Sequence, residues 1–399
     1  MAESFWQESP MGKRKHHSLI DKVYALPNLL LSWEKVRANR GAGGIDGQTI
    51  AQFEAKLLEN LQELHRVLRE GKYHPLPVRR VYIPKSDGGE RPLGIPAVRD
   101  RVVQQAVLQV LQPVFEPLFE DCSYGFRPAR SAHQAIAKIE TLRVLGYKHV
   151  VEVDLKSFFD TLDHELLVAR VAEEIADGRI LGLIRGWLEA GVLEEGAVRT
   201  QVAGTPQGGV ISPLLANIYL HAFDRIMVRR GYQVVRYADD FVVLCKTPKK
   251  AERALEVVQQ LITEDLKLTI HPEKTRLTSF REGFEFLGFH LYHRFKKPRK
   301  KAVEGLKDKV RRLTRRQQGC NLEAVIKALN PVIRGWGTYF RQTNWKVVAD
   351  ETDAWIRMRL RSFIRKQVTV RSKYNAVYTV SFLQKKGLVS LTSRIAPAP

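Results

Sequence analysis

Two adjacent aspartates stand in the middle of a segment that otherwise favours a buried β-hairpin. The segment VVRYADDFVVL, residues 234–244, places Asp239 and Asp240 between two runs of β-branched and aromatic side chains. Neighbouring carboxylates repel each other, and each loses hydration when it enters an apolar sheet. Taken alone, the pair is better explained by a hairpin turn, because aspartate is common at turn positions.

A third aspartate changes this interpretation. In VVEVDLKSFFD, residues 150–160, Asp154 follows a run of valines that predicts a buried strand. Two hydrophobic strands that each deliver aspartate can bring three carboxylates together in one sheet. Such a cluster is unstable unless divalent cations occupy it, and Mg²⁺ prefers carboxylate oxygens, phosphates and water. Two Mg²⁺ ions held by Asp154, Asp239 and Asp240 would clamp the attacking hydroxyl and the leaving group of an in-line phosphoryl displacement.

The charge distribution indicates a polyanionic partner. Of the net charge of +22, +20 lies in residues 291–399, which contain 26 Lys and Arg against 6 Asp and Glu. The first 290 residues are nearly balanced, with 39 basic and 37 acidic residues. A lysine-rich solvated surface is the alternative explanation. Nucleic acid is favoured because aromatic residues, Trp336 and Trp345 among them, are interleaved with the charges.

Other classes of protein are not indicated. There is no apolar run of membrane-spanning length and no signal-peptide pattern, so we expect the chain to stay in the cytoplasm. Cys122, Cys245 and Cys320 are far apart and never form CxxC, which argues against a disulfide framework and a zinc ribbon. With 399 residues, 44% of them hydrophobic, an ordered protein of two or three domains is expected.

The elements that must position these residues follow from periodicity. Apolar residues spaced three and four apart predict helices over 18–36 and about 50–70. The glycine-rich NRGAGGIDG between them, residues 39–47, predicts a tight loop with positive φ. VRRVYIPKSDGGERPLGIP, residues 78–96, predicts a β-hairpin that turns at SDGG, and a long apolar helix over about 99–119 follows.

The second half of the chain changes character. A helical pattern covers 247–268, and FEFLGFHLY, residues 284–292, predicts a pair of strands. Beyond these strands the chain is helical and basic. The sequence therefore predicts an α+β body followed by a helical appendix.

A series of motifs, in order along the chain, resembles the group II intron reverse transcriptase/maturase family. YADD together with DLKSFFD resembles the palm motifs of reverse transcriptases. RPLGIPAVRDRVVQQA, SYGFRPARSAHQA, GTPQGGVISPLLANIYL and FLGF resemble this family specifically, and NRGAGGIDG resembles its N-terminal extension block. The resemblance runs from about Leu19 to Phe289 and continues, more weakly, through the thumb-like LNPVIRGWGTYFRQTNW.

The resemblance implies an α+β fold shaped as a right-hand polymerase. Fingers and palm would surround an antiparallel palm sheet, with a helical extension before them and a helical thumb/maturase region after them. The expected parts are a flexible N-terminus (1–17), the N-terminal extension (18–70), fingers and palm (71–290), the thumb/maturase domain (291–370) and a short basic C-terminal segment (371–399).

The resemblance also assigns the metal ligands. Asp154 and Asp239 would be the main ligands, Asp240 would support them, and the backbone carbonyl of Leu155 would complete a shell. The expected cofactor is a pair of Mg²⁺ ions, with Mn²⁺ as a substitute.

Nucleotide-binding residues are implied in three motifs. Lys85 and Arg91 match the triphosphate-binding positions of the fingers hairpin, with Arg101 nearby; solvated hairpin charges are the alternative. Gln207 would lie beside the incoming nucleotide and Gly208 would shape its approach, although Gly208 also suits an ordinary turn.

One aromatic residue of DLKSFFD would lie under the sugar and exclude a 2′-hydroxyl by bulk. Phe159 is favoured by analogy, with Phe158 packing in the core, but the sequence alone does not separate the two.

Contacts to nucleic acid are expected at two places. Arg127 and Arg130 of SYGFRPAR would contact template phosphate or, equally well, form local ion pairs. Basic residues of the appendix would follow a primer–template backbone or structured RNA: Lys296, Lys297, Arg299, Lys300, Arg311, Arg312, Arg315 and Arg316. Trp336, Tyr339 and Trp345 are more often core residues than base-stacking platforms.

The activity implied is an RNA-directed DNA polymerase that uses dNTPs and a DNA primer or target. It would also bind group II intron RNA, assist its splicing, and copy it at a target site by target-primed cDNA synthesis (retrohoming). No histidine follows His293 and no cysteine follows Cys320, so we expect a member that lacks the family's HNH endonuclease. A relative domesticated for defence or repair, and a splicing-only RNA-binding maturase, are the alternatives. The oligomeric state stays open, a homodimer included.

Overall fold

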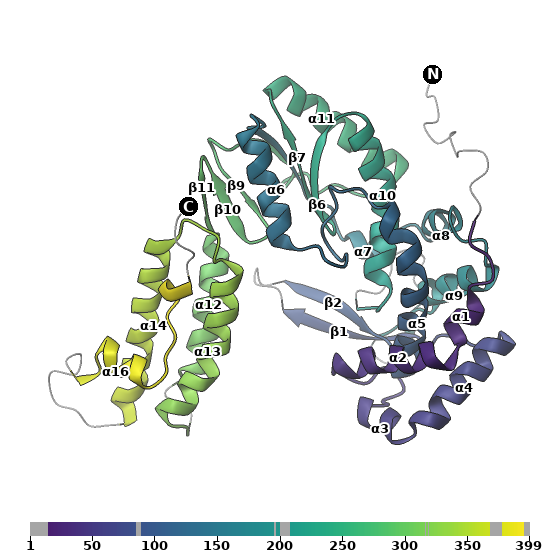
Figure 1. Ribbon diagram of the computed structural model, residues 1–399, viewed down its shortest axis with the longest axis horizontal. Coiled ribbons are helices and arrows are strands. Elements are labelled where there is room, and N and C mark those ends of the chain that lie inside the picture. The colour runs from purple at the N-terminus through teal and green to yellow at the C-terminus, as the bar shows by residue number, and fades with distance from the viewer. Residues whose placement is uncertain are drawn as a thin grey trace. The chain divides into compact units, whose positions relative to one another are not determined.

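The structure is a computed structural model that describes residues 15–84, 89–194, 197–199, 208–315, 317, 319–367 and 377–394. Lys85, Gln207 and Arg316, three of the predicted binding residues, lie outside the described residues. The chain divides into two compact units, residues 1–277 and residues 278–399 (Figure 1).

The N-terminal extension consists of four helices that follow the apolar pattern. They are α1 (Ile20–Tyr24), α2 (Leu26–Ala38), α3 (Ile50–Ala55) and α4 (Leu57–Glu70). The single helix predicted over 18–36 is divided at Ala25, whose ψ of 128° is not helical. Pro27 lies in the first turn of α2, where the missing N–H breaks no helical bond. The helix predicted over about 50–70 is interrupted at Lys56, between α3 and α4.

In the glycine-rich loop over 39–47, the absence of a side chain at Gly43 and Gly44 lets other backbone segments pack closely. Among its described glycines only Gly47 has a positive φ, of 69°. A Cβ on Gly44 would lie 2.5 Å from the backbone of Ala97, and one on Gly43 would lie 2.9 Å from the carbonyl oxygen of Gln48. The prediction of positive φ therefore holds for Gly47, and Arg40 in the same loop also has a positive φ, of 48°. Tight packing explains Gly43 and Gly44.

The predicted hairpin over 78–96 is confirmed and belongs to a four-stranded sheet with the order β2-β1-β4-β5. The strands are β1 (Val78–Pro84), β2 (Glu90–Ile95), β4 (Val192–Glu194) and β5 (Ala197–Arg199). β1 and β2 are antiparallel, with Ile83 opposite Arg91 and Tyr82 opposite Pro92. Pro92 is tolerated because β2 is an edge strand.

A second four-stranded sheet, with the order β6-β7-β3-β8, corresponds to the predicted palm. Its strands are β3 (His149–Val153), β6 (Gln233–Tyr237), β7 (Asp240–Cys245) and β8 (Arg276–Ser279). β7 runs antiparallel to both β3 and β6. One continuous hydrophobic core extends from Leu19 to Leu268 and joins this sheet to the helices around it.

Helices surround the two sheets of the N-terminal unit. They are α5 (Val98–Phe115), η1 (Glu116–Leu118), α6 (Ala132–Val144), α7 (Phe158–Thr161), α8 (His164–Ala172), α9 (Gly178–Glu189), α10 (Ser212–Arg229), α11 (Pro248–Gln260) and η2 (Leu261–Asp265). α11 packs against β3 and β7, while α6 and α10 pack against β6 (Figure 1). The helices predicted over 99–119 and 247–268 each end in a short turn of another helical type, η1 and η2.

The C-terminal unit combines a small antiparallel sheet with helices. β9 (Phe284–Phe286), β10 (Phe289–Tyr292) and β11 (Phe295–Pro298) form the sheet, which confirms the strand pair predicted over 284–292. The helices are α12 (Lys300–Leu313), α13 (Leu322–Tyr339), α14 (Lys346–Gln367), α16 (Val380–Lys385) and η3 (Thr392–Arg394).

The α+β body and the helical appendix are confirmed. No helix among the described residues is both long enough and apolar enough to span a membrane.

Candidate active site

The palm sheet brings Asp154 and the YADD turn to the same edge. Val153, the last residue of β3, pairs with Phe241 of β7, so Asp154 leaves the sheet where β7 begins. Tyr237 pairs with Asp240, which leaves Ala238 and Asp239 as the turn between β6 and β7. Neighbouring strands lie about 4.8 Å apart, so this register brings the backbone of Asp154 close to the backbone of Asp239 and Asp240.

The carboxylates of Asp239 and Asp154 lie close enough for their charges to interact. Burial raises the pKa of Asp239, and the negative charge of Asp154 raises it further. The Asp239 backbone N–H and the charges of Arg91 and Arg236 lower this pKa, but they do not cancel the effect of burial. Two neighbouring carboxylates, one of them poorly hydrated, form a site whose charge a bound cation would relieve.

The environment of Asp240 differs from that of Asp239. Asp240 is exposed at the first residue of β7, whereas Asp239 is half-buried in the turn before it. Within the described part of the chain, no three His, Cys, Asp or Glu side chains lie together as a metal site would require. Asp154 and Asp239 still fit a Mg²⁺ site, because one or two carboxylates with substrate phosphates and water complete its shell.

Asp154 is fixed by contacts that the sequence did not reveal. Its carboxylate forms an ion pair with Lys274, with Nζ 2.9 Å from Oδ2. Its backbone carbonyl accepts a hydrogen bond from the His271 N–H at 2.8 Å, and the Lys156 N–H donates to the Thr269 carbonyl at 2.8 Å. These two backbone hydrogen bonds lie on either side of Leu155, and neither of them uses the Leu155 carbonyl. Lys274 lies far from Asp154 in sequence, and no periodic pattern marks it.

The residue directly before the YADD turn, Arg236, was not identified as important from the sequence. Arg236 is fully buried on β6 and forms an ion pair with Asp224 of α10 at 2.5 Å. An arginine inside the otherwise apolar run VVRY was the available signal, because a charge buried in a strand needs partners.

The fingers hairpin contributes one described cation to this edge of the palm. Arg91 is exposed on β2, and its positive charge is close enough to lower the pKa of Asp239. Arg101 is buried instead. Its Nε donates to the Pro96 carbonyl at 2.9 Å, and another guanidinium nitrogen donates to the carbonyl of Ala42. This arrangement favours a structural role for Arg101 over the predicted nucleotide contact.

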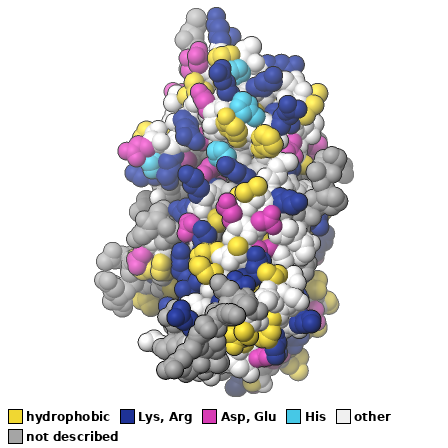
Figure 2. Space-filling model, turned by 90° about the vertical axis from the view of Figure 1, so that its left-hand side faces the viewer, with side chains coloured by type: hydrophobic (Ala, Val, Ile, Leu, Met, Phe, Trp, Pro, Cys, Tyr) yellow, Lys and Arg dark blue, Asp and Glu magenta, His cyan; other side chains and the backbone are white. Residues whose placement is uncertain are grey.

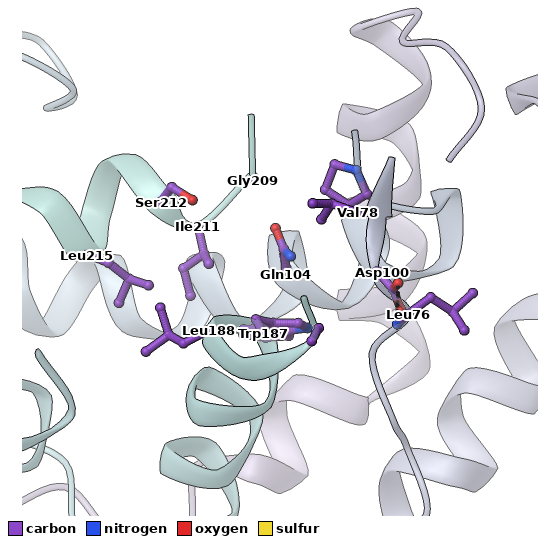
Figure 3. A pocket seen from close by; sticks show the side chains of 12 residues that line it. Leu76, Val78, Asp100, Gln104, Trp187, Leu188, Gly209, Ile211, Ser212 and Leu215 are labelled. Carbon is purple, nitrogen blue, oxygen red and sulfur yellow. Dashed lines mark hydrogen bonds between the residues drawn. The ribbon is translucent and has the colours of Figure 1, made fainter. Parts of the chain in front are cut away.

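Gly208 has a positive φ and lies close to the backbone of the fingers hairpin. Its φ is 118°, and a Cβ at this position would lie 2.5 Å from the carbonyl oxygen of Gly94 on β2. Two residues later, the Val210 N–H donates to the Oε1 of Gln104 at 2.7 Å. Figure 3 shows Gln104 beside Gly209 around a cavity of about 20 Å³, which is too small for a nucleotide. Residues 208–210 are therefore held against β2 and α5 by close packing and a hydrogen bond.

The two phenylalanines of DLKSFFD have different environments. Phe158 is 2% exposed and belongs to the core, with its ring edge-on to Tyr219 at 6.5 Å between centroids. Phe159 is only half-buried and packs beside Phe158, with 5.1 Å between their centroids. This difference favours Phe159 as the residue that meets the sugar.

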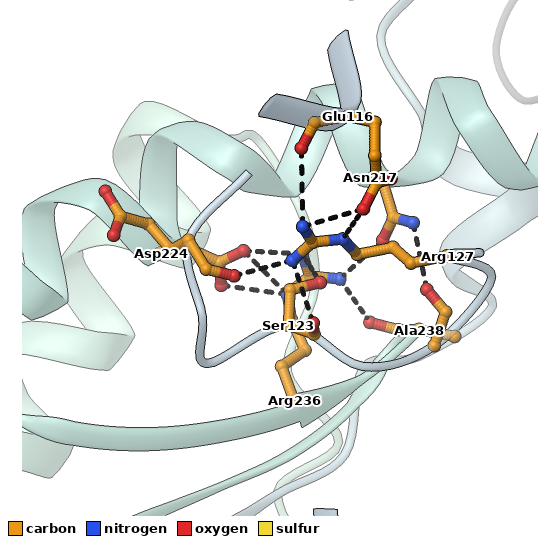
Figure 4. Close-up of polar contacts among 9 residues, drawn as sticks. Glu116, Ser123, Arg127, Asn217, Asp224, Arg236 and Ala238 are labelled. Atoms are coloured by element: carbon orange, nitrogen blue, oxygen red, sulfur yellow. Dashed lines mark hydrogen bonds and ion pairs between the residues drawn. The ribbon is translucent and has the colours of Figure 1, made fainter. Parts of the chain in front are cut away.

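Arg127 and Arg130 form local ion pairs, one of the two alternatives that the sequence left open. The Arg127 side chain is 4% exposed, pairs with Glu116 at 2.8 Å and also donates to backbone carbonyls (Figure 4). Its burial leaves no surface for template phosphate. Arg130 pairs with Asp121 at 2.6 Å and is partly exposed.

The basic residues of the C-terminal unit are mostly exposed. Figure 2 shows Lys and Arg side chains spread over a face of this unit, with hydrophobic side chains between them. The exposed members of the predicted set are Lys297, Lys300, Arg311, Arg312 and Arg315, whereas Lys296 and Arg299 are half-buried. Arg311 pairs with Asp308 at 2.5 Å and lies over the Trp355 ring.

The aromatic residues of this unit form a core. Trp345 is 1% exposed, and its ring packs edge-on to Trp336 at 5.0 Å. The Trp336 Nε1–H donates to the Ala302 carbonyl at 3.3 Å, and the Tyr339 hydroxyl donates to the Leu287 carbonyl at 2.8 Å. These contacts support the core interpretation over base stacking.

Comparison with known proteins assigns the family. Residues 83–291 match the reverse transcriptase (RNA-dependent DNA polymerase) family, and residues 303–379 match the group II intron maturase-specific domain. Protein YkfC of Escherichia coli is 40% identical over 62% of this chain and 75% of its own length. The group II intron-encoded protein LtrA of Lactococcus lactis is 31% identical, over 65% of this chain and 54% of LtrA.

Among solved structures, a telomerase from Candida albicans aligns over 85% of this chain and 72% of that chain. Its TM-score is 0.47 and its sequence identity 13%, so the assignment does not depend on it. The two family matches confirm the predicted reverse transcriptase and maturase character of the chain. The chain belongs to the reverse transcriptase family: it is an RNA-directed DNA polymerase of the group II intron reverse transcriptase/maturase type.

Proposed function

We propose that Asp154 and Asp239 hold the metal ions of this polymerase and that the C-terminal unit binds group II intron RNA. The chain would then assist splicing and copy the RNA by target-primed cDNA synthesis during retrohoming. The observation that carries the proposal is the meeting of Asp154 and Asp239 at one edge of the palm sheet. A splicing-only protein would have no use for this costly pair of carboxylates.

The metal site would consist of the two carboxylates, the Leu155 carbonyl, and Asp240 as a supporting acidic group. Two Mg²⁺ ions, with Mn²⁺ as a substitute, would lower the pKa of the attacking 3′-hydroxyl and stabilise the negative charge of the leaving pyrophosphate. Before a metal binds, Lys274 neutralises Asp154. Its ammonium group must move aside or share the carboxylate when a cation enters.

Other residues of the N-terminal unit would bind the dNTP. Arg91 of the fingers lies close enough to Asp239 to lower its pKa and would neutralise the triphosphate together with Lys85. Phe159 would exclude the 2′-hydroxyl by bulk. Gly208, packed against Gly94, would let the Gln207 loop come close to the incoming nucleotide.

The exposed basic residues of the C-terminal unit would bind RNA. Lys297, Lys300, Arg312 and Arg315 present charge on one strand and on the helix region that follows it. Phosphate contacts of this kind give affinity without strict geometry, because each one releases counterions.

A primer-extension assay on an RNA template with Mg²⁺ tests the proposal. We expect Asp239→Ala to abolish cDNA synthesis while the affinity for RNA stays within twofold of the parent. Asp21→Ala, an exposed aspartate on α1, is the matched control and should extend normally. Full-length extension by Asp239→Ala would show that the metal site lies elsewhere.

A further inference from the structure

Arg236 is a fully buried charge only three residues before Asp239. An arginine inside a sheet is tolerated only when every donor is paired. Its position in VVRYADD places it on β6, with its side chain directed into the polar network of Figure 4. The acceptors of the Arg236 guanidinium therefore indicate which parts of the site this residue holds in place.

All five N–H donors of the Arg236 guanidinium have acceptors. Nε and Nη2 donate to the Asp224 carboxylate of α10 at 2.8 and 2.5 Å. Nη2 also donates to the Ser123 hydroxyl at 2.8 Å, and Nη1 donates to Asn217 Oδ1 at 3.0 Å. The remaining bond runs from Nη1 to the backbone carbonyl of Ala238 at 2.8 Å.

The bond to Ala238 matters most for the site. A carbonyl and the next residue's N–H belong to one planar peptide unit, so fixing the Ala238 carbonyl fixes the plane that carries the Asp239 nitrogen. Ala238 also has a φ of 59°, in the left-handed region that residues with a Cβ rarely adopt. Such a conformation persists only where the surroundings enforce it.

The SYGF loop holds the turn from the other side. The Tyr124 N–H donates to the Arg236 carbonyl, and the Arg236 N–H donates to the Cys122 carbonyl, both at 2.8 Å. A Cβ on Gly125 would lie 2.2 Å from the Ala238 nitrogen, and the Gly125 carbonyl accepts from Asn217 Nδ2 at 2.9 Å. Loop, helix α10 and turn therefore meet at Arg236.

We propose that Arg236 is a positioning residue: its guanidinium, held by Asp224 and Asn217, sets the orientation of the Ala238–Asp239 peptide and thereby the aim of the Asp239 carboxylate. Arg236 touches neither substrate nor metal, and it acts on the reaction only through Asp239. The inference rests on the proposed metal-binding role of Asp239.

The test separates positioning from simple support of the fold. The double variant Arg236→Met/Asp224→Leu removes both buried charges together, so no charge is left unpaired and the protein should still fold. We expect a near-normal thermal midpoint and normal template–primer affinity. The extension rate at saturating dNTP should fall at least tenfold, and the binding of Mn²⁺, measured by electron paramagnetic resonance without nucleic acid, should weaken by a similar factor.

A second variant keeps the test open if the double variant does not fold. Arg236→Lys retains the charge beside Asp224 but cannot reach both Asp224 and the Ala238 carbonyl with one compact group. It should lower kcat at least fivefold and leave KM for dNTP unchanged. As a control, Arg185→Met/Glu165→Leu removes an exposed ion pair between α8 and α9 and should keep both the rate and Mn²⁺ affinity within twofold.

Wild-type rate and Mn²⁺ affinity in a folded Arg236→Met/Asp224→Leu or Arg236→Lys variant would overturn the positioning role. The variant Asp239→Asn tells this outcome apart from failure of the proposed function. If Asp239→Asn is inactive while the Arg236 variants are fully active, only the positioning role is wrong. If Asp239→Asn itself is active, the metal assignment is wrong as well.

Discussion

Asp239 projects from a turn whose backbone is held by a buried arginine and by the close approach of Gly125. The basic residues of the C-terminal unit, such as Arg312 and Arg315, project into solvent around the end of α12. One region thus uses many buried contacts to orient a single carboxylate, whereas the other presents many exposed charges on its surface. Chemistry on a phosphoryl group requires accurate placement, whereas attraction to a phosphate backbone tolerates considerable freedom.

The largest effect should come from crowding the turn. In Gly125→Val, added side-chain atoms would collide with the backbone of Ala238, because even a Cβ would lie 2.2 Å from its nitrogen. A displacement of about 1 Å at a reacting group can cost about 100-fold in rate, and we expect a loss of this order in primer extension. RNA binding by the C-terminal unit, measured by filter retention, should be unchanged. Normal extension by this variant would show that the turn is less constrained than its packing implies.

The next largest effect concerns the fingers. Arg91→Ala removes the exposed cation whose charge lowers the pKa of Asp239, and a hydrogen bond to a charged group contributes about 1.5–3 kcal/mol. KM for dNTP should therefore rise by about 10- to 100-fold, with template–primer affinity preserved. Steady-state kinetics with one dNTP varied would measure it. An unaltered KM would assign triphosphate binding to other residues.

The two phenylalanines should respond differently to the same substitution. Phe159→Ala opens space beside the nucleotide and should reduce discrimination against ribonucleotides by at least about 10-fold. Phe158→Ala leaves a cavity in the core instead, and should lower the free energy of unfolding by about 3–5 kcal/mol. Extension with NTPs and denaturant unfolding measure the two effects. The assignments must be exchanged if Phe158→Ala is the variant that admits ribonucleotides.

Single changes in the C-terminal unit should have small effects. Arg312→Ala or Arg315→Ala removes one exposed charge among several, so RNA affinity should fall only a few-fold. The slope of log affinity against log salt should decrease by about 0.7–0.9 for each phosphate contact that is lost. Binding isotherms across a salt series measure this slope. A complete loss of binding from one substitution would contradict a distributed electrostatic surface.

The smallest effect is a gain in stability. Burial raises the pKa of Asp239 in the folded protein, so ionised Asp239 destabilises the fold at any pH above that pKa. Asp239→Asn should therefore raise the thermal midpoint of the metal-free protein at pH 7. This advantage should shrink as the pH falls through the folded pKa, because the parent aspartate becomes neutral as well. A lower midpoint at pH 7 would show that Asp239 is stabilised by contacts other than those described.

The sequence predicted what periodicity and local motifs encode. The fingers hairpin, the strands before Asp154 and around the YADD turn, and the strand pair at 284–292 all follow from short runs or alternations of apolar residues bounded by turn signals. Helices that the apolar pattern had joined are divided at Ala25 and Lys56, because backbone conformation at one residue interrupts a helix without changing that pattern.

The contacts that fix the site were not predictable in the same way. Lys274 reaches Asp154, and Asp224 reaches Arg236, through tertiary packing that leaves no local signature. The sequence pattern also did not separate Asp239, half-buried in the turn, from Asp240, which is exposed at the start of β7. For Arg127, sequence offered two roles, and only its burial separated them.

Binding of Mn²⁺ to the metal-free protein, followed by electron paramagnetic resonance, tests the central claim most directly. If Asp154 and Asp239 share one site, the parent should bind Mn²⁺ and either Asp154→Asn or Asp239→Asn should weaken that binding at least tenfold, while Asp21→Asn should not. Equal Mn²⁺ binding by the parent and both site variants would contradict a metal centre at this edge of the palm sheet.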